Sequence, residues 1–347
     1  MTAPTPPHGA GHAGRRAAIA VSLAALVLCA GMLALARPGV ARAASAKQIV
    51  ATLNAERAAN RIPAGIVENP VWSVACQLHN AYQHRYGALS HSETEGKPGY
   101  SSAGNLIAQT SVLAQGIYWT PPGGNPYDNA PFHLFDLLNP RLSAIGAADS
   151  EGFGCVEIEL GTLRRAPAAV KAYSYPGNHR RRVPVSQRAE EMPESPAQTV
   201  GLGTHTTGPN LFVYFDGPWT NGSRAQLSSA TLRSSRGSVA LRWIDNTTSN
   251  LLPPTGAILV PAAPLKPATT YRVSVRGTVT GVVPGSSMEQ ALASCTEGEA
   301  GGVSCGQPPS TACFADFATQ LAACGLARSW DVSKDFSFKT AGPAHKR

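Results

Sequence analysis

The spacing of apolar residues changes along the chain, and this change constrains the fold more than any other feature. Between residues 47 and 161 apolar side chains recur at helical spacing, whereas from residue 200 onward they alternate with polar ones. Residues 162–199 separate the two stretches and contain five prolines and a run of three arginines. The pattern predicts an α+β domain over 47–161, a linker over 162–199 and an all-β sandwich over 200–341.

Local patterns place the expected elements within these domains. The spacing predicts helices over 49–59, with Asn54 and Glu56 facing outward, over 72–86 and over 132–138. Strands are expected over 144–148, 155–160, 211–216, 239–243, 257–260, 271–275 and 336–338.

The first 46 residues have the pattern of an export signal. Arg15 and Arg16 precede a mainly apolar run over 17–36, and two small-residue triplets follow, ending at Ala43 and Ala46. This order is typical of a secretory signal peptide, here predicted over residues 1–46. Cleavage is expected after Ala43 or after Ala46, and the sequence does not decide between these two bonds. A retained membrane helix is the competing interpretation. We expect removal, and hence a secreted or cell-envelope-associated protein without a stable membrane span.

The cysteine count agrees with export. One of the seven cysteines, Cys29, lies in the leader, and an even set of six remains for an oxidising compartment. Cys76 and Cys155 are the only cysteines of the first domain, and we expect them to form a disulfide. The other four cysteines could form two disulfides or bind zinc. Their spacing contains no C-x-x-C pair, which favours disulfides, but the sequence does not determine which cysteines pair. These four lie in an insertion over 287–330: Cys295, Cys305, Cys313 and Cys324.

Charge is distributed unevenly between the domains. The formal net charge is +8, which by itself suggests an anionic partner. Residues 47–160, however, hold six basic and ten acidic side chains, a net charge of −4, and the two later stretches are each +4. We therefore expect no nucleic acid at a site in the first domain.

Three motifs of the first domain occur in the order and spacing of a known family. They are LNAER at Leu53–Arg57, LSHS at Leu89–Ser92, and NAPFHLFDLLNP at Asn129–Pro140, which is followed by Ile145-Gly146. Over residues 47–161 the chain resembles the CAP superfamily of cysteine-rich secretory proteins, antigen 5 and pathogenesis-related proteins. The resemblance implies an α-β-α sandwich whose cleft contains two histidines and two acidic residues.

The resemblance carries over to particular residues only in part. His91 and His133 match the two cleft histidines, but Ala103–Leu106 reads AGNL where the family has a glutamate in G-E-N-L. Glu93 and Asp128 are the remaining candidate acids. Two imidazoles with a carboxylate or water could hold a divalent cation such as Zn²⁺, so His91 and His133 are candidate metal ligands, and such a cation is the candidate cofactor.

The second domain has a resemblance of its own. PLKPATTYRVSV at Pro264–Val275 and FSFKT at Phe336–Thr340 resemble bacterial Ig-like modules, which space or bind rather than catalyse. The leading hypothesis is non-enzymatic, extracellular binding of a small apolar, lipid-like or cell-envelope ligand. One alternative is a metal-assisted hydrolase or peptidase that uses His91, His133 and Glu93. Another is a structural adhesin that acts through the Ig-like domain.

Overall fold

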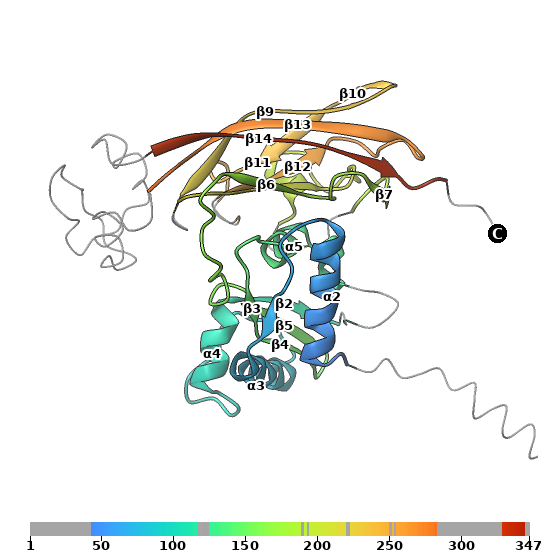
Figure 1. Ribbon diagram of the computed structural model, residues 1–347. Coiled ribbons are helices and arrows are strands. Elements are labelled where there is room, and N and C mark those ends of the chain that lie inside the picture. The colour runs from blue at the N-terminus through green and yellow to red at the C-terminus, as the bar shows by residue number, and fades with distance from the viewer. Residues whose placement is uncertain are drawn as a thin grey trace, which may run out of the picture. The chain divides into compact units, whose positions relative to one another are not determined.

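The described residues form a mixed α+β structure (Figure 1). The computed structural model describes residues 43–116, 119, 125–188, 191–192, 194–219, 223–249, 252, 255–282 and 328–343. The described residues, which begin at residue 43, belong to one compact unit. The apolar run of the predicted signal peptide and the four cysteines between 295 and 324 lie outside the described residues. Within these ranges no helix has both the length and the apolar character needed to cross a membrane.

The N-terminal part packs helices around a small sheet. The sheet is antiparallel with the strand order β2-β5-β4, and α3 packs against β4 and β5. A parallel pair, β1 with β3, lies beside it. The bounds of the elements are α2 (Ala46–Ala59), β1 (Val67–Glu68), α3 (Pro70–Tyr86), α4 (Ser102–Gln109), β2 (Ser111–Gln115), η1 (Pro126–Asn129), α5 (Pro131–Leu137), β3 (Ala144–Ile145), β4 (Ala147–Ser150) and β5 (Phe153–Glu157).

Local sequence signals set the ends of the two longest helices. Ser45 caps α2 in a capping box with Gln48, and Asn69 caps α3, whose first residue is a proline. Gly87 ends α3 in the left-handed conformation, at φ +63°, which glycine adopts without a steric penalty. The helix predicted over 72–86 is therefore present and begins two residues earlier.

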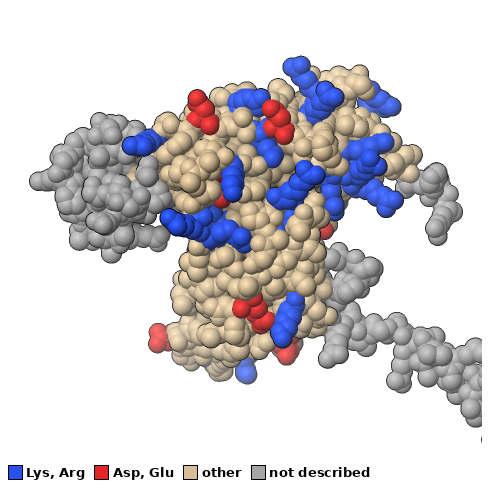
Figure 2. Space-filling view, in the orientation of Figure 1, with Lys and Arg blue, Asp and Glu red and all other residues tan. Residues whose placement is uncertain are grey.

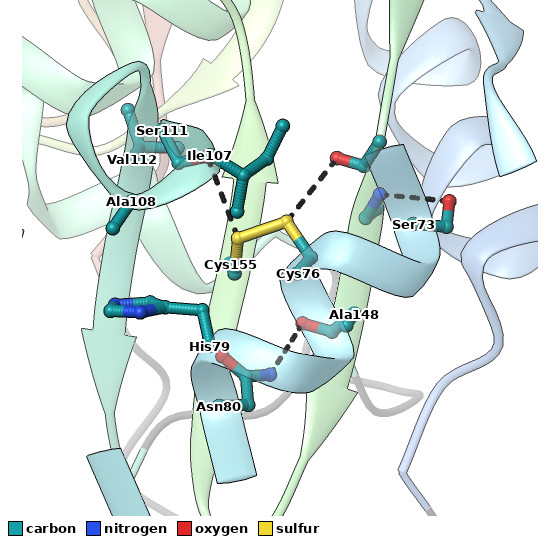
Figure 3. The surroundings of a disulfide bond; sticks show 12 residues. Ser73, Cys76, His79, Asn80, Ile107, Ala108, Ser111, Val112, Ala148 and Cys155 are labelled. Carbon is teal, nitrogen blue, oxygen red and sulfur yellow. Dashed lines mark hydrogen bonds between the residues drawn. A yellow bond between two sulfur atoms is a disulfide. The ribbon is translucent and has the colours of Figure 1, made fainter. Parts of the chain in front are cut away.

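A disulfide joins α3 to the sheet (Figure 3). It connects Cys76 on α3 with Cys155 on β5, 79 residues apart, and both residues are fully buried. Ile107, Ala148 and Leu113 pack around it. The bond closes a long loop and so restricts the unfolded chain strongly.

Two larger sheets follow and share one apolar core. The four-stranded sheet has the order β11-β12-β8-β6, and the five-stranded sheet has the order β10-β9-β13-β14-β7. On β13, Val273 and Val275 point into this core, while Arg272 and Arg276 are exposed, as period-two alternation requires. The bounds are β6 (Lys171–Tyr175), β7 (Arg180–Val183), α6 (Pro196–Thr199), β8 (Leu211–Asp216), β9 (Arg224–Ser234), β10 (Gly237–Val239), β11 (Leu241–Ile244), β12 (Gly256–Pro261), β13 (Thr270–Gly281) and β14 (Arg328–Thr340).

The four-stranded sheet is covered on both faces, because its second face packs against α5. The Phe135 ring lies 4.4 Å from the ring of Tyr214 and 5.3 Å from that of Phe212, measured between centroids. A Cβ atom at Gly256 would lie 2.3 Å from Phe135 Cζ, so this close approach needs glycine. Every residue of β8 and β12 is buried as a result.

Residues 162–199, predicted as a linker, contribute a strand to each of the two larger sheets. β6 pairs antiparallel with β8, and β7 pairs parallel with β14. Pro176 and Pro184 each follow directly after one of these strands, where a proline removes no hydrogen bond from the strand itself. The predicted domain boundaries stay a prediction.

Candidate functional site

The structure does not pair His91 with Glu93. His91 is exposed on the loop after α3, and its Nδ1 lies 2.8 Å from the carbonyl oxygen of Ala108. Glu93 is buried, and its Oε1 lies 3.0 Å from Nδ1 of His79. Its Oε2 accepts a hydrogen bond from the backbone N–H of Ser101 at 2.8 Å. The candidate carboxylate therefore belongs to another histidine.

His79 and Glu93 form a pair without solvent exposure of either side chain. His79 Nε2 lies 2.8 Å from the carbonyl oxygen of Ser90, which can only accept, so Nε2 carries a proton. His79 Nδ1 lies 3.0 Å from the Glu93 carboxylate oxygen Oε1, which is within hydrogen-bonding distance. The spacing of His79 and His84 along the helix predicts an ordinary surface or core role for His79. In the structure His79 is a buried residue beside the disulfide (Figure 3).

Gly104 leaves room for the carboxylate of Glu93. A Cβ atom added to Gly104 would lie 2.3 Å from Glu93 Oε1. The Glu93 carboxylate thus fills the space that a side chain at position 104 would enter. The amide oxygen of Asn105 accepts the Glu93 N–H at 2.8 Å and helps to hold this arrangement.

His133 lies in the first turn of α5 and binds Glu191. The Glu191 carboxylate is hydrogen-bonded to His133 Nδ1 and accepts the backbone N–H groups of Phe132 and His133, each at 2.9 Å. The His133 ring stacks on Tyr127, with centroids 5.6 Å apart and planes 9° apart. Glu191 lies in the segment that composition predicts to be a linker, so local sequence patterns do not indicate this partner.

The candidate metal ligands do not converge. His91 binds a carbonyl group, His133 binds Glu191, and Glu93 binds His79. In the part of the chain that the structure describes, no group of three or more His, Cys, Asp or Glu side chains could hold a metal ion. These residues do not fit the tetrahedral donor set that zinc uses, and we derive no metal-dependent step.

Asp128, the fourth candidate, lies in a pocket of about 720 Å³ between α2, η1 and the β6–β7 segment. Its carboxyl group interacts electrostatically with that of Glu56. Glu56 accepts a hydrogen bond from Asn125 Nδ2 at 3.0 Å, and Tyr175 lines the same pocket. We call Glu56 and Asp128 the carboxyl pair, and their cavity the carboxyl pocket.

Burial and mutual repulsion shift the proton affinity of the carboxyl pair. Burial raises the pKa of Glu56, against the opposing effect of its polar neighbours Asn125 and Tyr175. Burial, followed by the charge of Glu56, raises the pKa of Asp128 to about 7. Near pH 7, where Asp128 is about half protonated, the pair can present a protonated carboxyl group beside an ionised one. Such a pair presents a hydrogen-bond donor and an acceptor side by side.

Glu56 is a site residue that periodicity placed on an outward helix face. It is half-buried in the structure and lines the carboxyl pocket together with residues of the β6–β7 segment. Glu56 becomes part of a pocket only because the β6–β7 segment, which is distant in the sequence, also lines that pocket. The one sequence feature that could have indicated this role is the position of Glu56 within the LNAER motif.

A larger groove, of about 1110 Å³, lies on the outer face of the five-stranded sheet. Arg233, Arg236 and Arg272 line it, and basic side chains gather toward one end of this sheet in Figure 2. Among the described residues that line it, Asp335 is the single acid, and Arg276 binds it at 2.9 Å. The carboxyl pocket is the stronger candidate, because two neighbouring carboxyl groups in one concavity have raised pKa values.

A comparison of the chain with protein-family models finds no match, and neither does a comparison with curated proteins.

Proposed function

We propose that the protein is a secreted, non-enzymatic binding protein that takes a small, hydroxyl-rich ligand of the cell-envelope type in the carboxyl pocket. The resemblance of residues 47–161 to CAP proteins and of residues 200–341 to Ig-like modules supports an extracellular binding role. The predicted signal peptide agrees with it. The observation that carries the proposal is the carboxyl pair, Glu56 with Asp128, in a pocket of about 720 Å³.

The chemistry of the lining favours a saccharide over a purely apolar ligand. A carboxyl pair with one proton both donates and accepts hydrogen bonds, as sugar hydroxyl groups do. Asn125 and Tyr175 add an amide and a phenol to the same wall, and the exposed Ala55, Ala59 and Pro184 supply apolar surface for a sugar face. A few convergent polar groups in an apolar setting are typical of small-molecule sites.

Calorimetric titration tests the proposal with neutral tetrasaccharides of glucose, mannose, arabinose and N-acetylglucosamine. We expect saturable binding of at least one of them. Glu56→Ala and Asp128→Ala should each weaken it at least about tenfold, because they remove charge-assisted hydrogen bonds. Glu95→Ala, which changes an exposed glutamate, is the matched control and should bind like the wild type. Absence of binding to all four sugars, or equal affinity of all variants, would refute the proposal.

A second candidate function is amide hydrolysis by the carboxyl pair. It is favoured by one observation, the two neighbouring carboxyl groups with raised pKa values, because one could activate water while the other protonates a carbonyl oxygen. Cleavage of a mixed fluorogenic peptide library should then decline as the pH rises through about 7, where Asp128 loses its proton. Asp128→Asn should abolish turnover. Turnover that survives this substitution would exclude the pair as its source.

A further inference from the structure

A buried carboxylate on β4 lacks a cation. Asp149 is 5% exposed, and its Oδ2 accepts the backbone N–H groups of Ala44 at 3.1 Å and of Trp119 at 3.2 Å. Its Oδ1 is buried without a hydrogen-bond partner, and none of the ion pairs between described residues includes it. An isolated buried carboxylate is strongly unfavourable, so this position calls for a positive charge.

Ala44 is placed to supply that charge. Its nitrogen already lies against Asp149, and the residue is 8% exposed, whereas Ala43 is exposed. In a chain that begins at Ala44 the same nitrogen is an α-ammonium group with three protons. One proton can keep the bond to Oδ2, and another is available for Oδ1.

We propose that export processing hydrolyses the peptide bond between Ala43 and Ala44, and that the new ammonium group of Ala44 forms a buried ion pair with Asp149. Water is the co-reactant: the C–N bond breaks, Ala43 keeps the carboxylate of the leader, and Ala44 receives the amine, which takes up a proton. The enzyme is of the signal-peptidase class, which recognises small residues one and three positions before the bond. Ala41 and Ala43 are those residues here.

The structure opposes the other candidate bond, after Ala46. Cleavage there would remove Ala44 and leave Asp149 without its nearest donor. It would also remove Ser45, whose Oγ accepts the Gln48 N–H at 3.3 Å and whose carbonyl oxygen accepts the Ile49 N–H at 3.0 Å. Both bonds satisfy N–H groups at the start of α2 that have no partner within the helix.

Mass spectrometry of the exported protein tests the bond itself. The full chain is expressed with its own leader in a host that exports it, and the N-terminal peptide of the product is sequenced. We expect Ala44 as the first residue. A product that begins at Lys47, or one that retains the leader, would overturn the proposal.

Unfolding equilibria test the ion pair separately. Chains that begin at Ala43 or at Ala44 are released from a fusion protein, each with Asp149 and with Asp149→Asn. We expect the chain that begins at Ala44 to have an unfolding constant at least about tenfold smaller than the chain that begins at Ala43. The difference should vanish in Asp149→Asn and persist in the control Asp331→Asn, which changes an exposed aspartate.

Equal stability of the two chains, or a difference that survives Asp149→Asn, would refute the ion pair. If Asp149→Asn does not fold, acetylation of the Ala44 amine replaces it. Loss of the stability difference on acetylation supports the ion pair, and an unchanged difference overturns it. Neither measurement involves the carboxyl pocket, so the result is independent of the proposed function.

Discussion

At the scale of single residues, buried polar side chains fix the first part of the chain by binding backbone groups. Arg57 is fully buried and donates to the carbonyl oxygens of Pro63, Leu137 and Asn139, each at 2.9 Å. Burial lowers the pKa of Arg57 to about 10. Asn54 accepts the N–H groups of the loop after α2. The LNAER motif that carries the family resemblance therefore has a structural role in this chain.

The His79–Glu93 pair leads to a prediction at this scale. His79→Ala should lower the free energy of unfolding by about 3–5 kcal/mol, because Glu93 is then left buried without its partner. His91→Ala is the matched control, since His91 is exposed and binds one carbonyl group, and should cost about 1 kcal/mol or less. Urea unfolding of both variants measures the difference. Equal costs would show that the pair is not an important stabilising contact.

At the scale of elements, a residue far away in the sequence completes the start of α5. This helix has no side-chain cap of its own, and Glu191 accepts the N–H groups that a cap would bind. A carboxylate at a helix N-terminus also interacts favourably with the helix dipole. The short α5 thus depends on the β7–α6 connection for its first turn.

Glu191→Ala should therefore destabilise α5 selectively. We expect a loss of about 1–2 kcal/mol and faster hydrogen exchange at the amides of Phe132 and His133. Glu194→Ala, three residues further on, is the control and should leave both amides protected. Unchanged exchange at Phe132 in Glu191→Ala would contradict the capping role.

Elements with a strong local signal could be predicted, and those without one could not. The helices over 70–86 and 131–137 lie within two residues of their predicted bounds, because caps, prolines and periodicity all act locally. The strand predicted over 155–160 lies over 153–157 instead. The sequence does not predict β6 and β7, because their prolines and charged residues are typical of a linker. These strands form through pairing with β8 and β14, which are distant in the sequence.

At the scale of the whole molecule, the apolar core extends from the helical part into the four-stranded sheet. Phe135 packs on Phe212 and Tyr214, and the Tyr214 hydroxyl donates to the Phe135 carbonyl oxygen at 3.0 Å. Arg141 binds Asp216 at 2.8 Å across the same boundary. These contacts couple the two parts energetically.

We therefore expect one cooperative unfolding transition for both parts. Phe135→Ala should lower the free energy of unfolding by about 3–5 kcal/mol, and the amides of β5 and β13 should lose protection at the same urea concentration. Leu106→Ala, on an exposed side chain, should cost less than about 0.5 kcal/mol. Separate transitions for β5 and β13 would show that the two parts unfold independently.

The sequence by itself determined the features that depend on neighbours along the chain. These are the change from helical to period-two spacing, the helix caps, the strand alternation of β13 and the motifs around His91 and His133. The tertiary structure decided the partners: Glu93 with His79, Glu191 with His133, and Glu56 with Asp128. The physical reason is that burial, hydrogen-bond pairing and shifted pKa values arise from groups 14 to 72 residues apart, and local patterns contain no information about such distances.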